Sequence, residues 1–526
     1  MIPNLRLQVR RRPDSRYVVE EPSERLTLTN SHLASTGPGI EVAKYRDLLT
    51  RGDLRVPDGF LLGASTAAYQ IEGGANAGGR GPSIWDTFSH TPGKTADGAT
   101  GDVAADHFHR MNEDLDLMAA LGLGAYRFSI SWSRVMPLGE GDMNPEGMQF
   151  YSSLVDGLLA RGITPVVTLN HWDLPQHLED IYGGWRGRET AYAFERYAEE
   201  MGSLLGDRVW MWSTHNEPWN NSYSGYGSGA FAPGVANHED ALKAVHHLNL
   251  AHGLGVAALR RTVTHPDLNV SIVLNIFRIE GVTPSDDEAV RLVDAVANRA
   301  FTGPVLRGSY PDDLIEDTRK ITDWAFVLPG DMAICHQRLD SLGINYYEVM
   351  HVRSNEAYLP GSDFLGGTDF PGSERISVVR KDDIGRTAMD WGVEPRGLED
   401  HLLAVSAEFP ELPIIVMENG AAFTDEVTEL NGSSAVVDRQ RTQYLIDHLT
   451  ATLSAKGRGA NVVGYFVWSL LDNFEWALGY GPRFGIIRVD YDTLARTPKL
   501  SAAWLAEVNA TRLVSQLRNS PTQRTD

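Results

Sequence analysis

Short apolar runs alternate with longer segments of helical periodicity along most of the chain, from Phe60 onward. In the longer segments apolar residues recur every third or fourth position, as at Leu115, Met118 and Leu121, which is typical of amphipathic helices. The short runs, rich in β-branched residues, are expected to be strands. There are eight of them, at residues 60–63, 125–130, 164–169, 209–214, 270–275, 341–345, 413–417 and 462–468.

Eight apolar strands separated by helices predict an α/β fold, a single (β/α)8 TIM barrel with long loops after its strands and an N-terminal extension. An open doubly wound sheet is the alternative, but the glycine-rich segments at 73–81 and 225–229 lack a phosphate-binding pattern. We assign the barrel to residues 56–515. Residues 1–55, rich in Arg, Glu, Ser, Thr and Pro, are predicted to be a flexible or loosely docked extension, and residues 516–526 a C-terminal tail.

The net charge of the chain limits the classes of partner that it is expected to bind. Of 526 residues, 69 are acidic and 47 are basic, which gives a net charge of −22. Such a balance argues against nucleic acid and anionic membranes as partners. The apolar stretch at 462–471 is too short to span a bilayer, and no apolar segment follows the N-terminal arginines, so we expect no membrane span, no secretory signal and a cytoplasmic location. The sequence leaves a homo-oligomer open.

Polar residues cluster where the predicted strands end, and in a barrel the side chains at these ends converge on one face. Two of them are carboxylates, Glu217 after the fourth strand and Glu418 after the seventh. Cleavage of a glycosidic bond needs one carboxylic acid for the leaving oxygen and one carboxylate at the anomeric carbon. The amides, imidazole and tryptophans at the other strand ends suit the hydroxyls and C–H faces of a sugar. We therefore predict a sugar-cleaving site.

Each residue taken alone also has a structural interpretation. Glu217 or Glu418 alone is as consistent with an ion-pair partner as with a reacting group, and Asn216 or His171 alone with a satisfied buried polar group. No His and carboxylate cluster stands at metal-ligand spacing, so no metal site is predicted. The single cysteine, Cys335, forms no internal disulfide and is expected to be a buried thiol.

Taken together, the motifs resemble the family 1 glycoside hydrolases, the β-glucosidase group, from about Phe60 to Trp504. The matching segments are FLLGASTAAYQIEG at 60–73, YRFSISWSR at 126–134, LNHWDLP at 169–175, THNEP at 214–218, GINYY at 343–347, MENG at 417–420, WSLLDNFEW at 468–476 and RFG at 483–485. The resemblance implies a retaining β-glycosidase without metal or organic cofactor. It makes Glu217 the general acid/base and Glu418 the nucleophile.

The resemblance also assigns the residues around the two glutamates. Three of them, Arg127, Asn345 and Tyr347, are expected to support the nucleophile. The substrate-binding residues are expected to be Gln70, His171, Trp172, Asn216, Trp468, Glu475, Trp476 and Phe484. The chain departs from the family pattern at Leu62, His215 and Met417, none of which is a reacting group. Loops, among them the segment 219–231 and the polar stretch 353–390, are expected to form the leaving-group pocket, with aromatic rings from Tyr223, Tyr226 and Phe231.

The expected substrate is a small β-glucoside or oligosaccharide with a terminal non-reducing β-D-glucosyl residue, and galactosyl and fucosyl residues stay open. A carboxylate at Glu475, beside the O4 and O6 of the sugar, would repel a 6-phosphate, which disfavours a 6-phospho-β-glucosidase. A transglycosidase would use the same residues and is not excluded by the sequence. A sugar-binding pseudoenzyme would be expected to lack one of the two glutamates, and both are present.

Overall fold

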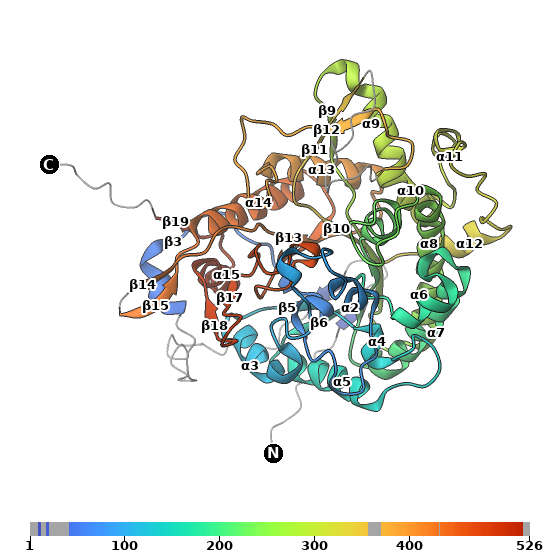
Figure 1. Cartoon of the computed structure of the whole chain (residues 1–526). Helices are drawn as coiled ribbons and strands as arrows, with labels where there is room; N and C mark the ends of the chain where they lie inside the picture. The colour runs from blue at the N-terminus through green and yellow to red at the C-terminus, as the bar shows by residue number, and fades with distance from the viewer. Residues whose placement is uncertain (1–8, 12–16, 20–41, 356–369, 431, 519–526) are drawn as a thin grey trace. The chain divides into compact units, whose positions relative to one another are not determined.

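The computed structural model describes residues 9–11, 17–19, 42–355, 370–430 and 432–518. Its central feature is a closed barrel of parallel strands in the order β10, β13, β16, β4, β5, β6, β7, β8 (Figure 1). The prediction of a single (β/α)8 barrel is confirmed, and each expected run lies within two residues of a barrel strand. The strands are β4 (Leu61–Ser65), β5 (Ala125–Ser129), β6 (Thr164–Asn170), β7 (Met211–Asn216), β8 (Asn269–Leu274), β10 (Leu342–Asn345), β13 (Ile414–Asn419) and β16 (Val462–Trp468).

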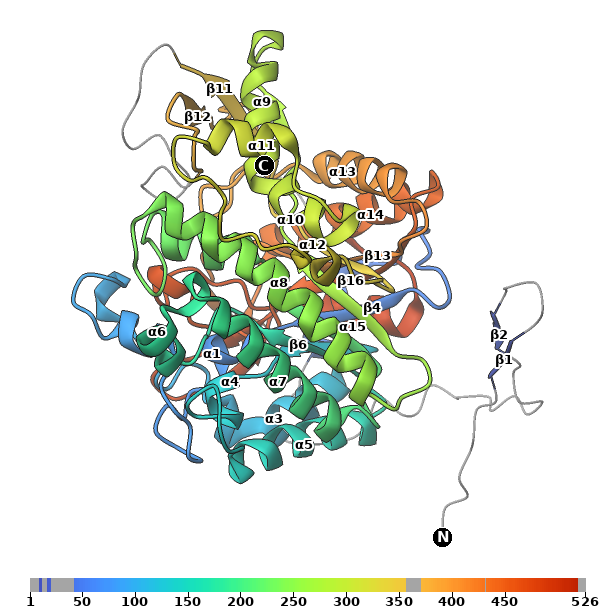
Figure 2. The ribbon, with the colours of Figure 1, turned by 90° about the vertical axis from the view of Figure 1, so that its right-hand side faces the viewer.

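Helices cover the outside of the barrel, and Figure 2 shows two of the longest, α7 and α8, side by side. Helix α7 buries apolar residues such as Phe194, Met201 and Leu205, whereas no residue of α8 is exposed between positions 241 and 259. Among the described residues, no helix is both long enough and apolar enough to cross a lipid bilayer. The longer helices are α3 (His107–Ala120), α5 (Pro145–Ala160), α7 (Arg188–Leu205), α8 (His238–Thr262), α13 (Pro395–Glu408), α14 (Arg439–Gly457) and α15 (Leu500–Thr511).

The loops carry shorter elements of their own. Strands β9, β11 and β12 form a small sheet, while β14 pairs with β15 and β17 with β18. The short helices are α1 (Ala68–Ile71), α2 (Ile84–Ser89), α4 (Trp132–Val135), α6 (Gln176–Tyr182), α9 (Asp287–Asp294), α10 (Ala300–Thr302), α11 (Asp312–Thr318) and α12 (Asp331–Cys335). The short strands are β9 (Ile279–Gly281), β11 (Met350–Ser354), β12 (Ile376–Val378), β14 (Val427–Leu430), β15 (Ser433–Val436), β17 (Ile487–Val489) and β18 (Arg496–Pro498).

The interior of the barrel is filled by side chains, so the barrel is a packed core and not a channel. One buried cluster joins strands from around the barrel and consists of Ala125, Val166, Met211, Val273, Ile415, Met417 and Phe466. The close packing explains the glycine at position 63 of β4, because a Cβ there would lie 2.6 Å from a ring carbon of Phe466. This core fixes the strand ends above it, which carry the predicted site.

The structure differs from the sequence in where the N-terminal extension ends. The chain divides between Ile40 and Glu41, not after residue 55. The 3₁₀ turn Val42–Leu48 already belongs to the barrel unit, since Tyr45 is buried and its hydroxyl donates to the carbonyl oxygen of Pro498 at 3.0 Å. Strand β3 (Leu49–Thr50) then pairs with β19 (Gln516–Leu517), so the predicted tail also starts inside this unit. The sequence did not predict these contacts, because the few apolar residues of these segments stand among polar ones and form no periodic pattern.

The first unit is described only in part. Strands β1 (Val9–Arg11) and β2 (Tyr17–Val19) pair in antiparallel fashion. The flexible arm predicted for the remainder of residues 1–41, and the tail predicted for 519–526, lie outside the described residues.

Candidate active site

A cavity of about 310 Å³ lies at the carboxyl ends of the barrel strands. A space of this size is typical of a small-molecule site. The structure brings ten of the thirteen predicted site residues to its wall: His171, Trp172, Glu217, Asn345, Tyr347, Glu418, Trp468, Glu475, Trp476 and Phe484. The other three, Gln70, Arg127 and Asn216, are buried behind that wall and hydrogen-bond to residues that line it.

Glu418, at the end of β13, is held by a cation and a phenol. A guanidinium nitrogen of Arg127 lies 2.6 Å from its Oε1, and the hydroxyl of Tyr347 donates to its Oε2 at 2.9 Å. Charge-assisted bonds of this kind favour an ionised carboxylate. Burial raises the pKa of Glu418, and the charge of Arg127 opposes that rise. Glu418 is therefore suited to carry a negative charge although it is buried.

Glu217, just after β7, has a different environment. Its carboxylate accepts hydrogen bonds from two amides, from Asn345 to Oε1 at 2.8 Å and from Asn220 to Oε2 at 2.6 Å. Among the described residues it forms no ion pair. Burial and the nearby charge of Glu418 raise the pKa of Glu217 to about 8. Of the two glutamates, Glu217 is the one that holds a proton at neutral pH.

An amide relay connects the two glutamates. The side-chain oxygen of Asn216 accepts from Arg127 at 2.6 Å and from Asn345 at 3.1 Å, and Asn345 also reaches Glu217. The amide nitrogen of Asn216 lies 3.1 Å from Nε2 of His171. Burial holds the pKa of His171 well below its usual range, so its ring is neutral and accepts this bond. The relay therefore holds both carboxylates in place relative to the ends of β7 and β10, which carry Asn216 and Asn345.

Opposite the strand ends, the segment after β16 supplies Glu475 and Trp476. Gln70 holds this segment by donating from Nε2 to the side-chain oxygen of Asn473 and to the carbonyl oxygen of Phe474, each at 2.9 Å. Burial and the charges of Glu418 and Glu217 raise the pKa of Glu475 to about 8.

Aromatic rings and unpaired polar atoms meet in this part of the wall. The ring of His171 stacks on Trp468 at 5.7 Å, and Trp172 packs against Trp476 at 4.6 Å. Within the part of the chain that the structure describes, Oε1 of Gln70, Nδ1 of His171 and Oδ1 of Asn345 are buried without a hydrogen-bond partner. Buried polar atoms normally have partners. Flat rings beside unpaired donors and acceptors form a surface that suits a polyhydroxylated ring.

Three residues of the wall have a strained backbone. The φ angles of Trp172, Glu217 and Trp476 are +75°, +44° and +52°, in the left-handed region that bulky residues rarely adopt. Such strain is concentrated at functional sites, where the surrounding structure holds side chains in required directions. Nothing in the periodicity of the sequence indicated it.

The comparison with known proteins agrees with this geometry. The sequence profile of glycosyl hydrolase family 1 matches residues 53–513. The chain belongs to this family. A bifunctional β-D-glucosidase/β-D-fucosidase from Bifidobacterium breve is 45% identical over 85% of the chain and 96% of the relative. A thermostable β-glucosidase B from Thermobispora bispora is 46% identical over 87% of the chain and 91% of the relative.

Solved structures of the family have the same fold. The crystal structure of a psychrophilic β-glucosidase, BglU, from Micrococcus antarcticus superposes with a TM-score of 0.82 at 45% identity. The match covers 87% of this chain and 98% of that one. The resemblance identified from the motifs is thereby confirmed.

The expectation that Tyr223 and Tyr226 line the leaving-group side of this family 1 site is wrong. Tyr223 and Tyr226 do not reach the cavity, because their hydroxyls are buried against the carbonyl oxygen of Val296 and the carboxylate of Glu179. Phe231 does line the cavity, as expected. From the stretch 353–390 only Met389 is found at the wall among the described residues, and residues 356–369 lie outside them.

The sequence interpretation missed several residues of the wall. Asn220 belongs to the expected segment 219–231, but its bond to Glu217 was not predicted, and its place three positions after Glu217 was the available signal. Trp219 lines the cavity, as expected of the segment 219–231. Phe277 and Trp391 also line it, but as isolated aromatic residues in loops they carried no pattern. Of the departures from the family pattern, Met417 belongs to the barrel core, and His215 stacks on Phe194 at 4.6 Å.

Proposed function

We propose that this family 1 chain is a retaining β-glycosidase that hydrolyses terminal β-D-glucosyl residues, with Glu418 as the nucleophile and Glu217 as the general acid/base. The observation that supports the assignment is the contrast between the two carboxylates in one cavity. Arg127 and Tyr347 favour the charged form of Glu418, while burial and the charge of Glu418 favour the protonated form of Glu217. A retaining mechanism needs this division of roles.

In the first step, an oxygen of Glu418 attacks the anomeric carbon while Glu217 gives its proton to the departing glycosidic oxygen. The negative charge of Glu418 is then consumed in the glycosyl ester. Because that charge is one cause of the raised pKa of Glu217, the pKa of Glu217 falls after this step. Glu217 then takes a proton from the incoming water, which cleaves the ester and restores the β configuration.

The cavity wall supports an unphosphorylated sugar. Among the described residues that line it, four are glutamates (Glu217, Glu348, Glu418 and Glu475) and none is lysine or arginine. A sugar phosphate would bring a further negative charge into this buried acidic site without a cation to bind it. We therefore favour β-glucosides over 6-phospho-β-glucosides. Since the B. breve relative is named as both a glucosidase and a fucosidase, we also expect β-fucosides to be cleaved.

The leaving-group side of the cavity is apolar. It is lined by the side chains of Trp219, Phe231, Phe277, Trp391 and Leu478. The side of Leu478 is open to solvent, since this residue is 42% exposed. These groups suit an aryl or alkyl group, or the C–H face of a second sugar. The same cavity would admit a sugar hydroxyl in place of water, so transfer is a side reaction to be measured and not a separate function.

The test is hydrolysis of a 4-nitrophenyl β-glucoside and of cellobiose by the wild type and by Glu217→Gln. Loss of the acid is expected to lower kcat/KM by a factor of about 10²–10⁴ on cellobiose. The loss of kcat/KM should be smaller on the nitrophenyl glucoside, whose leaving group needs little protonation. Asp331→Asn is the matched control, a buried carboxylate bound to Arg188 and His246, neither of which lines the cavity.

Two results would contradict the proposal. Binding of glucosides without cleavage by the wild type would indicate a sugar-binding pseudoenzyme. A higher kcat/KM on a 6-phosphoglucoside than on the parent glucoside would indicate the phosphoglycosidase.

A further inference from the structure

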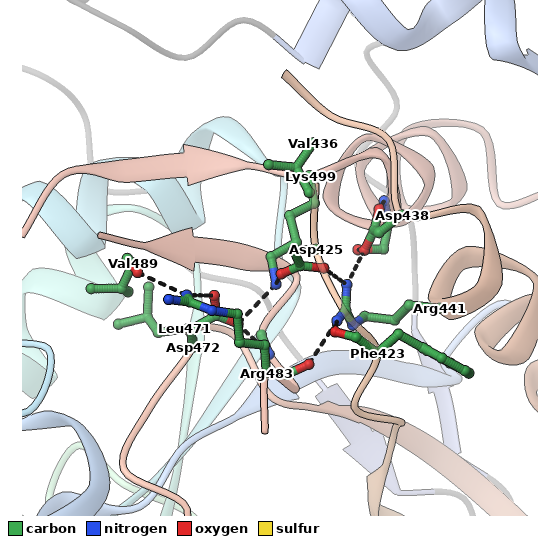
Figure 3. Close-up of polar contacts among 12 residues, drawn as sticks. Phe423, Asp425, Val436, Asp438, Arg441, Leu471, Asp472, Arg483, Val489 and Lys499 are labelled. Carbon is green, nitrogen blue, oxygen red and sulfur yellow. Dashed lines mark hydrogen bonds and ion pairs between the residues drawn. The ribbon is translucent and has the colours of Figure 1, made fainter. Parts of the chain in front are cut away.

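Six charged side chains form a buried chain of ion pairs beside the cavity (Figure 3). Carboxylates and cations alternate along it without a break in the order Asp438, Arg441, Asp425, Lys499, Asp472, Arg483. Five of the six side chains are at most 1% exposed, and Arg483 is 20% exposed. We call this set the charge chain. Such burial is costly unless each group is paired, and here each one is.

The charge chain connects two loops that carry residues of the cavity. Asp425 lies in the loop after β13, the strand of Glu418. Asp472 and Arg483 lie in the segment after β16, on either side of Glu475 and Trp476. The remaining members come from the starts of two helices, Asp438 and Arg441 from α14 and Lys499 from α15.

Asp472 closes the segment that carries Glu475. Its Oδ2 accepts from Arg483 at 2.6 Å, and its Oδ1 accepts from the backbone N–H of Gly485 at 3.0 Å. The two ends of residues 472–485 are therefore bonded to each other through one carboxylate. Phe484, which lines the cavity, stands between the two donors. The glycine is required here, because a Cβ at position 485 would lie 2.0 Å from the backbone nitrogen of Asp472.

The closed segment is also fixed to the loop of the nucleophile. Arg441 donates to the carbonyl oxygen of Arg483 at 2.6 Å and to those of Ala421 and Phe423 at 3.2 Å. Ala421 follows Glu418 by three residues in the chain. Lys499 ties the two loops a second time, through Asp425 and through Asp472 at 2.8 Å.

The segment reaches the cavity through Asn473 and Glu475. Asn473, next to Asp472, accepts from Gln70, which also lies 3.5 Å from Oε2 of Glu475. Glu475 and Trp476 lie on this segment beyond the end of β16, and the ring of Trp476 packs against Trp172. Their place opposite Glu418 depends on how residues 472–485 are held.

We infer that Asp472 and Arg483 are positioning residues that set the sugar specificity of the site, by fixing Glu475, Trp476 and Phe484 relative to Glu418. This inference rests on the proposed function and goes beyond it, because neither residue touches the cavity. If Glu475 binds the side of the sugar that bears C6, a displaced segment costs binding only to sugars that carry this group.

The experiment compares kcat/KM for the nitrophenyl β-glucoside with kcat/KM for the matching β-xyloside, which lacks the C6 group. The variants are Asp472→Asn, which keeps shape and removes charge, and Arg483→Gln, which removes the partly exposed partner. We expect the glucoside-to-xyloside ratio to fall by about tenfold, the effect of one hydrogen bond to a charged group, while the xyloside changes by less than about threefold. Arg483→Lys should restore part of the ratio.

Asp331→Asn is the control for loss of a buried ion pair elsewhere, and it should leave the ratio unchanged. An unchanged ratio in Asp472→Asn and Arg483→Gln, even with a lower Tm, would show that the charge chain is structural only. A glucoside-to-xyloside ratio near one in the wild type would also overturn the inference, because the segment would then make no productive contact with the C6 group. Failure of the wild type to cleave any glycoside would instead reject the proposed function. If Asp472→Asn does not fold, Arg483→Gln decides the outcome.

Discussion

Two groups of buried carboxylates lie near each other in this molecule, and they differ in their countercharges. The charge chain has three aspartates and three cations. The cavity has Glu217, Glu418 and Glu475, and among the described residues only Arg127 forms an ion pair with any of them. Both groups are buried, but the charge chain has a cation for each carboxylate, whereas in the part of the cavity that the structure describes only Glu418 is paired with a cation.

The difference appears in the protonation of the two groups. Burial raises the pKa of Asp425, but Lys499 and Arg441 outweigh it and the pKa falls below its usual value. Burial raises the pKa of both Glu217 and Glu475 to about 8, and the charge of Glu418 adds to the effect. Asp438 is intermediate, since burial raises its pKa even beside Arg441. A buried carboxylate is thus a structural anion or a proton donor according to the cations beside it.

The largest expected effect comes from removing the one cavity carboxylate that is stabilised as an anion. Glu418→Gly should lower kcat by a factor on the order of 10⁴ or more, because the covalent step is lost. Azide, which fits the space left by the side chain, should restore turnover of an activated aryl glucoside. The product expected is the α-glycosyl azide, identified by NMR. A β-glycosyl azide would contradict the assignment of Glu418 as nucleophile.

The second prediction breaks the balance of the charge chain. Lys499→Met leaves Asp425 and Asp472 without their shared cation and should lower the free energy of unfolding by about 3–5 kcal/mol, measured by urea denaturation. The control is Arg307→Gln, which removes an exposed pair with Glu408 and should cost less than about 1 kcal/mol. Equal effects of the two substitutions would mean that the buried pairing contributes no more than a surface pair.

The third prediction concerns pH. The acid must be protonated to act, and the pKa of Glu217 is raised to about 8, so kcat/KM should be retained below that value and lost as pH rises through it. Interacting carboxylates titrate together, so the alkaline limb of the pH profile of kcat/KM reports an apparent pKa of the whole site. In Glu217→Gln, assayed on the nitrophenyl glucoside, this alkaline limb should disappear. A limb that persists there would point to Glu475 as the titrating group.

The sequence predicted the parts of this molecule that periodicity and strand ends encode. The barrel strands, Glu217, Glu418 and the rings of Trp468 and Trp476 all follow from apolar runs and the residues that end them. The pairing of Asp472 with Lys499 did not, because the motif that contains Asp472 ends at Trp476 and Lys499 stands 27 positions after Asp472.

Contacts of single residues in loops were equally hidden. Asn220 reaches Glu217 only because the chain after β7 turns into a helical segment, and Tyr226 turns away from the cavity because Glu179 binds its hydroxyl. The N-terminal boundary was misplaced for a similar reason, since Tyr45 is one buried residue in a polar stretch. Such contacts depend on the folded neighbours and not on spacing along the chain.

The most direct test is to label the nucleophile with a 2-deoxy-2-fluoro-β-glucoside that bears a good leaving group, and to map the modified peptide by mass spectrometry. The fluorine slows both steps, and the leaving group lets the glycosyl ester accumulate. The account predicts one fluoroglucosyl group per chain, attached to Glu418, and its release when the labelled protein is left with an acceptor. A label on Glu217 or Glu475, or rapid inactivation without a covalent adduct, would contradict the account.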